Sequence, residues 1–413
     1  MDPLYILEIG AHTTKFGLFS TAKPKHILQS VTGVCKLEEK KNKKVYGEEI
    51  DENLSGIIVE PIIRPTFSGV LIDWDQLEEF IDYLLVQAEK DGIERSDLEI
   101  LNSRSPYFKD KDDETLTEIM FEKFGIDSFN NGRQPLFSLI SSSTVTGLLV
   151  DIGELTTRVT PYYKGTIMYH YADDFSVGGA HLSQYLSQLM SDEGLYLNDY
   201  EGEKLLNDFK SNHSFAGMTE ELEEKYSTFI NIINSESNNE QKKNEQKNID
   251  EIFVRLKKMI EFKKLRENCI FTDFAGRKYS ISKTTSQFVE PLFQPGIIGK
   301  TEEGLQNTIS KVIKNCDLNI RGDLVNNIVF TGSTARIGGI QDRLFFELQQ
   351  LMPQNAKIGF YGSTDESLSY FSWLGGCLCG RLWRENNSFL IDKHTYQEEG
   401  KQIVHEKIIE SVF

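Results

Sequence analysis

The sequence predicts an α/β protein, and three observations lead to that class. Apolar stretches with strand character alternate with stretches of helical periodicity along the 413 residues. A short motif occurs twice, at residues 8–15 and 151–158, each time directly after an apolar strand. The chain is also too long for one hydrophobic core, so two or more domains are expected. Alternating strands and helices favour sheets that are at least partly parallel.

The repeated motif consists of an acid, Ile, Gly, two variable residues, Thr, Thr and a basic residue. Its first copy runs from Glu8 to Lys15 and its second from Asp151 to Arg158. The glycine permits a tight turn and brings backbone N–H groups toward an anion, and the threonines restart a strand. Two such turns facing each other would bind a polyphosphate from both sides. The acids at the strand ends would hold a hydrated divalent cation. One copy alone would favour an ordinary β-hairpin, and the matched second copy favours the phosphate interpretation.

Periodicity and turn residues place the other elements. A glycine pair at a helix start, as at residues 178–179, can bring backbone amides close to a ligand. In chain order we expect helices after Asp73 and Asp113, a helix at 133–143 opened by Pro135, a strand pair with a tight turn at 148–165, a helix after 177–179, a helix at 305–313, a strand at 327–331, a helix after 338–339 and a small-residue helix from Trp373.

Composition excludes some functions and locations. The net charge of −18 argues against general nucleic-acid binding, which needs a basic surface. The first residues show no signal peptide, and no apolar stretch approaches the roughly 20 residues of a membrane helix. The five cysteines have neither disulfide-framework nor zinc spacing, so we expect buried or incidental thiols in a reducing compartment. The charge run at 36–44 is expected to be a solvated loop, and the polar segment 234–250 a mobile one.

Several motifs of the second half match one known family in content and in order. They lie at residues 177–179, 290–295, 330–334 and 370–376, and in a tail formed by 393–396, Gly400 and 403–405. With the two turns, they resemble actin and the actin-related proteins over nearly the whole chain. The motifs at 294–295 and 373–376 are the most specific, because hexokinases and Hsp70-type chaperones carry similar glycine turns.

The resemblance implies a two-lobed actin-like fold, with duplicated ribonuclease H-like domains, an ATP cleft between them, and ATP or ADP with Mg²⁺ as cofactors. It divides the chain into a first large subdomain (1–29, 66–141 and 371–413), a small subdomain (30–65), a second large subdomain (142–177 and 301–370) and a second small subdomain (178–300) with the polar insert near 234–250.

The resemblance also implies roles for individual residues. Gln134 would position the attacking water, and Glu8 and Asp151 would hold the metal through waters. Lys15 could instead be a plain exposed lysine, and Arg336 either an adenine-stacking cation or plain surface. The residues implied in nucleotide contact are Gly10, Ala11, His12, Lys15, Gly153, Glu154, Leu155, Gly179, Lys210, Gly332, Ser333 and Arg336.

Some positions depart from the family pattern, and they weaken the expected activity. A side chain in place of the second glycine of each turn crowds the phosphates. The departures are Glu8 for an aspartate, His12 and Leu155 for those glycines, Arg158 for the histidine beside the attacking water, Ser211 and Ser369 for a glutamate and a lysine that frame the adenosine, Arg336 for an apolar residue, and a short Lys-rich loop at 34–44.

We therefore expect a divergent actin-related protein that serves as a structural subunit of a multiprotein cytoskeletal assembly and is at most a slow ATPase. Its partners would be other protein subunits, including actin or actin-related proteins, with no direct nucleic-acid or membrane contact. The absence of long basic runs favours cytoplasm and cytoskeleton over nucleus. The alternatives are a subunit of a chromatin-remodelling complex and a self-polymerising actin-like ATPase. A sugar kinase or chaperone of the same fold is disfavoured by the 294–295 region and the tail.

Overall fold

The chain folds into two compact units. Unit 1 comprises Met1–Leu149, Tyr162–Met168 and Glu366–Phe413, and unit 2 comprises Val150–Pro161 and Tyr169–Asp365. Each unit is described by itself. This computed structural model describes residues 3–35, 43–47, 49–50, 57–66, 69–106, 108–197, 200–212, 214–235, 246–266, 270–272, 276–280, 284–353, 356–361, 365–383 and 389–409.

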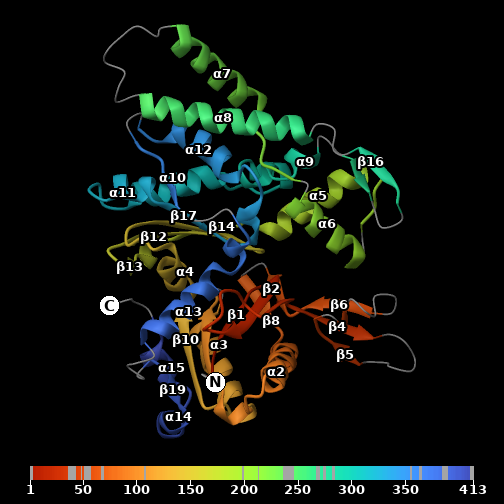
Figure 1. Cartoon of the computed structure of the whole chain (residues 1–413), viewed down its shortest axis with the longest axis vertical. Helices are drawn as coiled ribbons and strands as arrows, with labels where there is room; N and C mark the ends of the chain where they lie inside the picture. The colour runs from red at the N-terminus through yellow and green to blue at the C-terminus, as the bar shows by residue number, and fades with distance from the viewer. Residues whose placement is uncertain are drawn as a thin grey trace. The chain divides into compact units, whose positions relative to one another are not determined.

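Unit 1 is built on a sheet that has six strands among the described residues, in the order β19-β10-β9-β1-β2-β3. β1 runs parallel to β9, β9 runs parallel to β10, and β2 returns antiparallel to β1 (Figure 1). Every residue of β1 is buried, which explains its nearly unbroken apolar sequence. The strands are β1 (Leu4–Ile9), β2 (Thr13–Leu18), β3 (His26–Gln29), β9 (Glu99–Arg104), β10 (Ser128–Arg133) and β19 (Ile391–Asp392).

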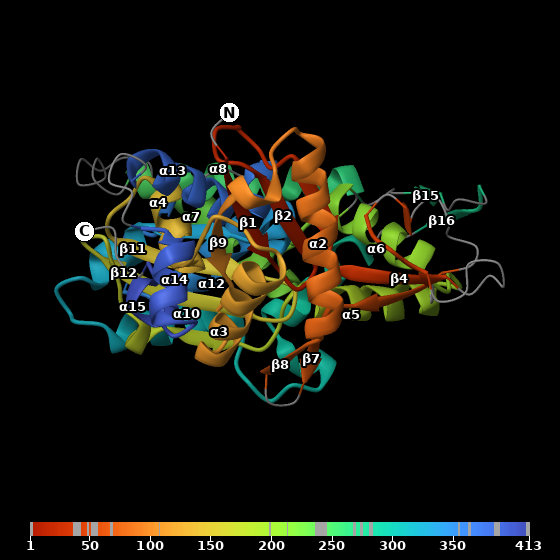
Figure 2. The ribbon, with the colours of Figure 1, turned by 90° about the horizontal axis from the view of Figure 1, so that it is seen from below.

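Helices and two small sheets complete unit 1. α4 (Gln134–Ser142) packs closely on α13 (Phe371–Trp383), because a Cβ on Gly375 would lie 1.8 Å from the Phe137 carbonyl oxygen (Figure 2). The other elements are α2 (Trp74–Lys90), α3 (Asp110–Glu118), the π-helical turn η4 (Ile119–Lys123), α14 (Lys393–Glu399), α15 (Ile403–Lys407), the sheet β5 (Lys44–Val45), β4 (Val31–Cys35) and β6 (Ile57–Pro61), and the pair β7 (Ile63–Thr66) and β8 (Gly69–Ile72).

The second large sheet runs in the order β13-β12-β11-β17-β18 among the described residues, and β14 pairs with β12. Lys164 and Gly165, with φ values of 50° and 79°, form the tight turn between β12 and β13. The strands are β11 (Gly147–Ile152), β12 (Thr157–Tyr163), β13 (Thr166–Ile167), β14 (Asp173–Phe175), β17 (Ile328–Thr331) and β18 (Phe360–Tyr361).

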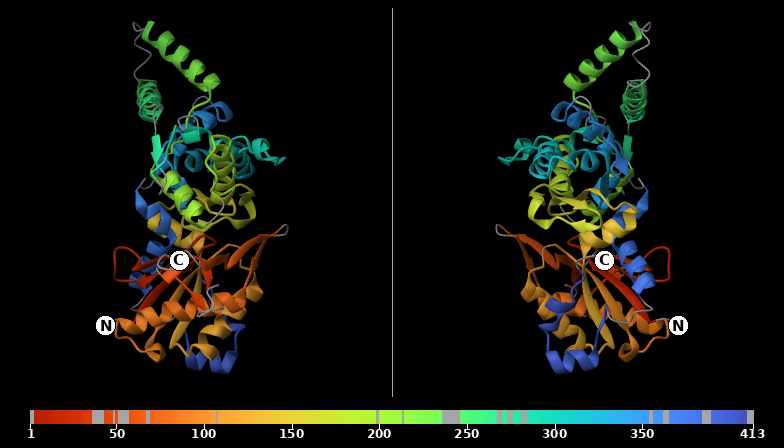
Figure 3. Two further views of the ribbon diagram at one scale, coloured as in Figure 1. Left: turned by 90° about the vertical axis from the view of Figure 1, so that its right-hand side faces the viewer. Right: turned by 90° about the vertical axis from the view of Figure 1, so that its left-hand side faces the viewer.

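The helices of unit 2 include a pair at its outer end. α7 (Glu220–Ser235) projects there (Figures 1 and 3) and contacts α12 (Ile340–Leu351), since the Tyr226 hydroxyl donates to the Phe346 carbonyl at 3.2 Å. α8 (Gln246–Arg266) also packs on α12, through the ion pair of Arg255 with Asp342. The other elements are α5 (Gly179–Asp192), α6 (Tyr200–Asn212), α9 (Thr284–Gln287), the short helical turns η7 (Glu290–Leu292), η8 (Pro295–Ile298) and η9 (Ser333–Arg336), α10 (Leu305–Asn315), α11 (Arg321–Asn326), and the hairpin β15 (Ile270–Thr272) and β16 (Lys278–Ser280).

The α/β class and the helices and strands expected from periodicity are confirmed, with two corrections. The helix expected after Asp113 begins earlier, at Asp110. The polar segment 234–250 is not a loop throughout, since residues 234–235 end α7 and 246–250 begin α8. Gln246 and Lys247 are good helix formers, which favours this extension of α8. Residues 236–245, and residues 36–42 of the Lys-rich loop, lie outside the described residues.

The cysteines in the described part of the chain are buried thiols. Cys35, Cys316, Cys377 and Cys379 are free and buried, as expected, while Cys269 lies outside the described residues. None of the helices in the described ranges is both long enough and apolar enough to cross a membrane. The finer division into four subdomains stays a prediction.

Candidate functional site

The first copy of the repeated motif, residues 8–15, is a tight turn between β1 and β2 and is called turn 1 below. The amide of Gly10 donates to the carbonyl of Thr13 at 3.2 Å, and a Cβ on Gly10 would lie 2.6 Å from that oxygen. The turn therefore requires glycine. Ser30 braces it from outside, because its hydroxyl donates to the Gly10 carbonyl at 2.6 Å and its amide to the His12 carbonyl at 2.8 Å.

The acid and the base of turn 1 form a buried ion pair. The register of β1 and β2 places Glu8 opposite Lys15, with the lysine Nζ 2.8 Å from the glutamate Oε1. Their side chains are only 6% and 7% exposed. Ser372 donates to the other oxygen, Oε2, at 2.7 Å. Both carboxylate oxygens of Glu8 therefore have partners, and the alternative that Lys15 is a plain exposed lysine is wrong.

The second copy, residues 151–158, is called turn 2 and has the same backbone closure. The amide of Gly153 donates to the carbonyl of Thr156 at 3.1 Å. The start of α5 is docked on this turn, since the Gly179 and Ala180 amides donate to the carbonyls of Gly153 and Glu154, each at 2.8 Å. The Gly179 amide is therefore engaged within the chain, and the expectation that this helix start offers it to a ligand is wrong.

Close backbone approaches shape the surroundings of turn 2. Asp151 lies near the end of β11, and Gly332, with a φ of 95°, follows β17. A Cβ on Gly332 would lie 2.3 Å from the Ile152 carbonyl oxygen and 3.0 Å from the Asp151 Oδ1. Only glycine can bring this loop so close to the Asp151 carboxylate.

A buried lysine lies near Glu154, one of the variable residues of turn 2. Lys210, from α6, donates to the Ser183 hydroxyl at 2.6 Å. Burial lowers the pKa of Lys210, and the charges of Glu154 and Glu203 act in the opposite direction. The Glu154 carboxylate also lies against Gly179, where a Cβ would be 2.6 Å from its Oε2. Unit 2 thus gathers predicted site residues from turn 2, α5 and α6.

Other predicted residues lie at the edges of these groups. Gln134 is the first residue of α4 and is half-buried. Ser333 and Arg336 in η9, and Ser211 on α6, are exposed, so the surface interpretation of Arg336 fits its environment. Ser369 donates to the Glu366 carbonyl at 2.6 Å.

Arg158, the base of turn 2, is held by a bidentate ion pair. Its Nε and Nη2 lie 2.6 and 2.7 Å from the two carboxylate oxygens of Asp174, the residue opposite it on β14. The Arg158 side chain is 27% exposed. Its guanidinium is therefore fixed on the sheet by a neighbouring strand, near the surface.

Two backbone amides of the turns are open. The amides of Ala11 and Leu155 make no hydrogen bond to any described residue, whereas the glycine amides beside them are engaged. Open amides in a glycine turn suit an anion. Nowhere in the described ranges do three or more His, Cys, Asp or Glu side chains gather closely enough to hold a metal directly.

Residues that the sequence reasoning missed serve mainly as braces. Ser30, between β3 and β4, fixes turn 1, and Asp174, on β14, fixes the base of turn 2. No local sequence pattern marks either residue. His181 also supports turn 2, because its Nδ1 accepts the Gly178 amide at 3.2 Å. A predicted strand at 173–175 would have suggested the Arg158–Asp174 pair as a cross-strand ion pair.

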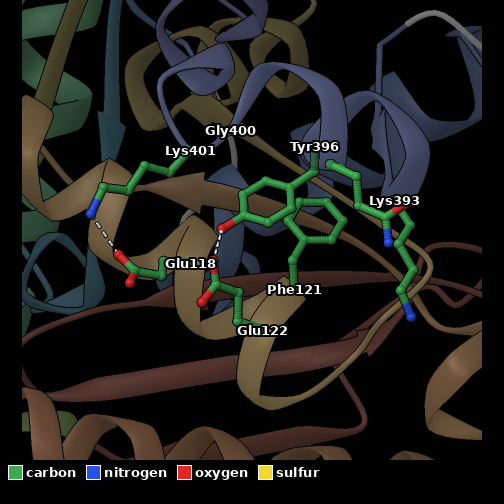
Figure 4. Close-up of a pocket in the computed structure, with 8 residues that line it drawn as sticks. Glu118, Phe121, Glu122, Lys393, Tyr396, Gly400 and Lys401 are labelled. Atoms are coloured by element: carbon green, nitrogen blue, oxygen red, sulfur yellow. Dashed lines mark hydrogen bonds and ion pairs between the residues drawn. The ribbon is translucent and has the colours of Figure 1, made fainter.

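Residues of the tail motif pack against α3 and η4 of unit 1, and together they line a pocket of about 650 Å³ (Figure 4). The rings of Tyr396 and Phe121 stack with centroids 4.4 Å apart, and the Tyr396 hydroxyl donates to Glu122 at 2.7 Å. Lys401 pairs with Glu118 at 2.6 Å. The pocket therefore lies between the tail helix α14 and the segment formed by α3 and η4.

The fold and the paired turns define a two-lobed α/β protein of the actin-like class. Comparison with known proteins agrees, because the family model for actin matches residues 3–409. The chain is also 25% identical over 409 residues to "Putative actin-29" of Dictyostelium discoideum, an alignment that covers 97% of this chain and 96% of that protein. The chain belongs to the actin family.

Proposed function

We propose that this actin-family protein binds an adenine nucleotide weakly, hydrolyses it slowly or not at all, and acts as a structural subunit of a cytoskeletal assembly. The observation that carries the proposal is the pair of turns. Both are closed by the same glycine-to-threonine hydrogen bond, and each retains one open amide, at Ala11 and Leu155. Anions are held by backbone amides arranged in this way.

Unit 2 supports nucleotide binding through its buried polar groups. Lys210 supplies a cation within reach of Ser183 and Glu154, and Gly179 and Gly332 let the backbone pack closely against Glu154 and Asp151. Asp151 is the carboxylate we assign to Mg²⁺, held through waters, because both oxygens of Glu8 already accept hydrogen bonds. The metal would supply positive charge that offsets the charge of the phosphates.

Weak binding is expected because the two turns differ from the family pattern in their net charge and in the size of their side chains. Lys15 is neutralised by its contact with Glu8, so it offers less net charge to a phosphate. His12 and Leu155 add side chains where the family has glycine. Ser211 is exposed and shorter than the glutamate it replaces, which removes a hydrogen bond worth about 0.5–1.5 kcal/mol.

Slow hydrolysis is expected because water activation depends on positioning. Gln134, the residue we assign to positioning the water, is the first residue of α4. Arg158 stands where the family has a histidine, and its ion pair with Asp174 fixes it. A guanidinium stays protonated near neutral pH and cannot accept a proton from water.

Nucleotide binding is tested by extracting bound nucleotide from purified protein and by titration with a fluorescent ATP analogue and Mg²⁺. We expect Lys210→Met to weaken binding about tenfold, a change of about 1.4 kcal/mol. Lys314→Met, an exposed change in the same unit, is the control and should leave binding unchanged. Absence of extracted nucleotide together with no response to ATP and Mg²⁺ would contradict the proposal.

Hydrolysis is tested by phosphate release over several hours. We expect a signal near background that Gln134→Ala does not change. A turnover like that of filamentous actin, abolished by Gln134→Ala, would instead support the active ATPase.

The assembly role rests on the loop at 34–44, which by resemblance contacts the next subunit in filaments. Residues 36–42, with Glu38, Glu39, Lys40 and Lys41, lie outside the described residues. At its described end, Lys44 pairs with Glu79 at 2.7 Å, and the segment offers charge to an interface. Interface cores depend on apolar anchors, so homopolymer growth is disfavoured.

Sedimentation and electron microscopy of the pure protein with ATP and Mg²⁺ test this point, and long regular filaments would favour the self-polymerising alternative. Mass spectrometry of co-purifying proteins distinguishes a cytoskeletal assembly from a chromatin-remodelling complex. Recovery of cytoskeletal subunits in fixed proportion would support the proposed role, and recovery of chromatin-remodelling subunits would overturn it.

A further inference from the structure

The outer helices of unit 2 carry an apolar groove that the nucleotide residues do not use. It has a volume of about 330 Å³, and the described side chains that line it come mainly from α8, with Ser227 from α7. The other lining residues are Phe253, Leu256, Lys257, Ile260, Glu261 and Lys264. α7 and α8 lie at the outer end of unit 2 (Figure 3), and the described residues that line the groove belong to these two helices.

One face of α8 packs against the rest of unit 2. Ile252, Leu256 and Met259 are buried at helical spacing, and Arg255 and Lys258 pair with Asp342 on α12 at 2.7 and 2.9 Å. These contacts fix the helix on the unit. The exposed residues of α8 therefore belong to a rigidly supported surface.

A second face of α8, roughly a quarter of a turn from the buried one, alternates apolar and basic side chains along one stripe. Phe253, Lys257, Ile260 and Lys264 follow one another at spacings of four, three and four residues, which places them on one side of a helix. Phe253 is 48% exposed and Ile260 is 36% exposed. Two exposed apolar side chains on one stripe, beside a groove, mark a surface suited to an apolar partner.

The charges of the groove point to an acidic partner. Two lysines and one glutamate line it, and Lys257 is 4.0 Å from Glu261, at the limit of an ion pair. This basic stripe belongs to a protein whose net charge is −18. The linker 236–245 of the chain itself contains no apolar residue, so it has nothing to bury in the groove.

We infer that the stripe of Phe253, Lys257, Ile260 and Lys264 on α8 docks an acidic amphipathic helix of a partner protein. Apolar residues of that helix fill the groove, and its carboxylates, about seven residues apart, meet the two lysines, which are two turns or roughly 10 Å apart. This names the kind of partner for the assembly role proposed above and rests on that role. It does not depend on nucleotide binding.

The experiment uses the full chain and a fluorescein-labelled peptide of about 18 residues, long enough to form a helix, with a leucine stripe flanked by glutamates. Binding is measured by fluorescence anisotropy, and a peptide with lysines in place of the glutamates is the control ligand. We expect the acidic peptide to bind, and the double variant Phe253→Ser/Ile260→Ser to bind at least about tenfold more weakly.

Two further variants separate docking from general effects. Val254→Ser changes an exposed apolar residue of α8 outside the groove and should leave binding unchanged. Lys257→Glu/Lys264→Glu should lose the acidic peptide and gain the basic one. A parallel titration of nucleotide shows whether these variants leave the nucleotide site intact, so that failure of the docking surface is distinguished from failure of the nucleotide proposal.

Four results would overturn the inference. The first is equal binding of both peptides, and the second is no binding of the acidic peptide. The third is binding to vesicles of anionic lipid that the groove variants abolish, which would assign the stripe to a membrane surface. The fourth is self-association in sedimentation velocity that Phe253→Ser/Ile260→Ser removes, which would assign it to a second copy of the chain.

Discussion

Turn 1 and turn 2 share a backbone closure and differ in what surrounds it. Gly10 and Gly153 each donate to the threonine three residues further on. Turn 1 is braced by a serine and has a buried ion pair at its base. Turn 2 is docked on the start of α5, and its arginine lies near the surface. Repeated residues therefore reproduce the local hydrogen bond, while neighbouring elements decide what each basic residue does.

The largest difference should appear when each base is removed. Lys15→Met would leave the buried carboxylate of Glu8 without its cation, which costs about 3–5 kcal/mol. The three tryptophans of the chain, Trp74, Trp373 and Trp383, all belong to unit 1, so tryptophan fluorescence during urea unfolding follows this loss. Arg158→Met breaks a more exposed pair and should cost about 0.2–1 kcal/mol.

Hydrogen exchange of residues 150–161 measures the Arg158→Met effect in unit 2. Lys15→Met/Glu8→Gln is the matched variant, because it also removes the buried charge and should recover part of the stability. Equal losses for Lys15→Met and Arg158→Met would contradict the contrast between the two turns.

The second effect concerns the close approach behind turn 2. Gly332→Ala forces a side chain into the left-handed region at a φ of 95° and against the Ile152 carbonyl, so we expect a loss of about 1–3 kcal/mol. Faster hydrogen exchange of β11 and β17 would report it. Gly322→Ala, where a Cβ meets no atom within 4 Å, is the control and should be neutral or slightly stabilising.

The third effect concerns the brace of turn 1. Ser30→Ala removes hydroxyl contacts to the Gly10 carbonyl at 2.6 Å and the Thr14 hydroxyl at 2.9 Å. Because Ser30 is buried, we expect a loss of about 1–3 kcal/mol in the transition seen by tryptophan fluorescence. Ser20→Ala, at an exposed position of unit 1, provides the control. A Ser30→Ala protein as stable as wild type would show that the turn does not need its brace.

The smallest effect is a pH dependence confined to turn 2. Burial, with the charge of Lys300, lowers the pKa of His181. The unfolded state then binds the proton more readily, so this contribution to stability is complete above the unfolded pKa of about 6.5 and falls as pH drops toward the folded value. Protonation of Nδ1 would also break its bond from Gly178.

Hydrogen exchange of residues 177–192, compared at pH values above and below the unfolded pKa of His181, should show weaker protection at the lower pH. His181→Asn, which keeps a side-chain acceptor but does not titrate, should reduce this dependence, while residues 8–18 of turn 1 should not share it. The same pH dependence in His181→Asn would assign the effect to another group.

Much of the fold could be predicted because its signals are local. Asp73 caps α2 by accepting the Gln76 amide at 3.1 Å, and such a cap before an apolar period is visible in the sequence. The glycine turns could be predicted for the same reason. The extension of α8 into 246–250 was missed because a polar segment was taken for a loop, although Gln246 and Lys247 favour helix.

The interactions of the site depend on pairing between distant strands and could not be predicted. The burial of Lys15 follows from the cover that Ser372 and its helix provide, more than 350 residues further along the chain. The partner of Arg158 depends on the register of β12 with β14. The engagement of the Gly179 amide depends on how α5 docks on turn 2. Local patterns identify candidate residues, and tertiary contacts determine what those residues are free to do.

The position of α13 has a consequence for how the protein is made. The Trp373 indole donates to the Ile6 carbonyl at 3.0 Å, so the first strand of unit 1 is completed by a helix from near the end of the chain. At about 5–20 residues per second, a ribosome needs roughly 20–70 s to translate the intervening segment. Unit 2 is encoded almost entirely within that interval. The nascent chain must therefore keep an apolar strand uncovered while a whole second unit emerges, and unit 1 can close only near the end of translation.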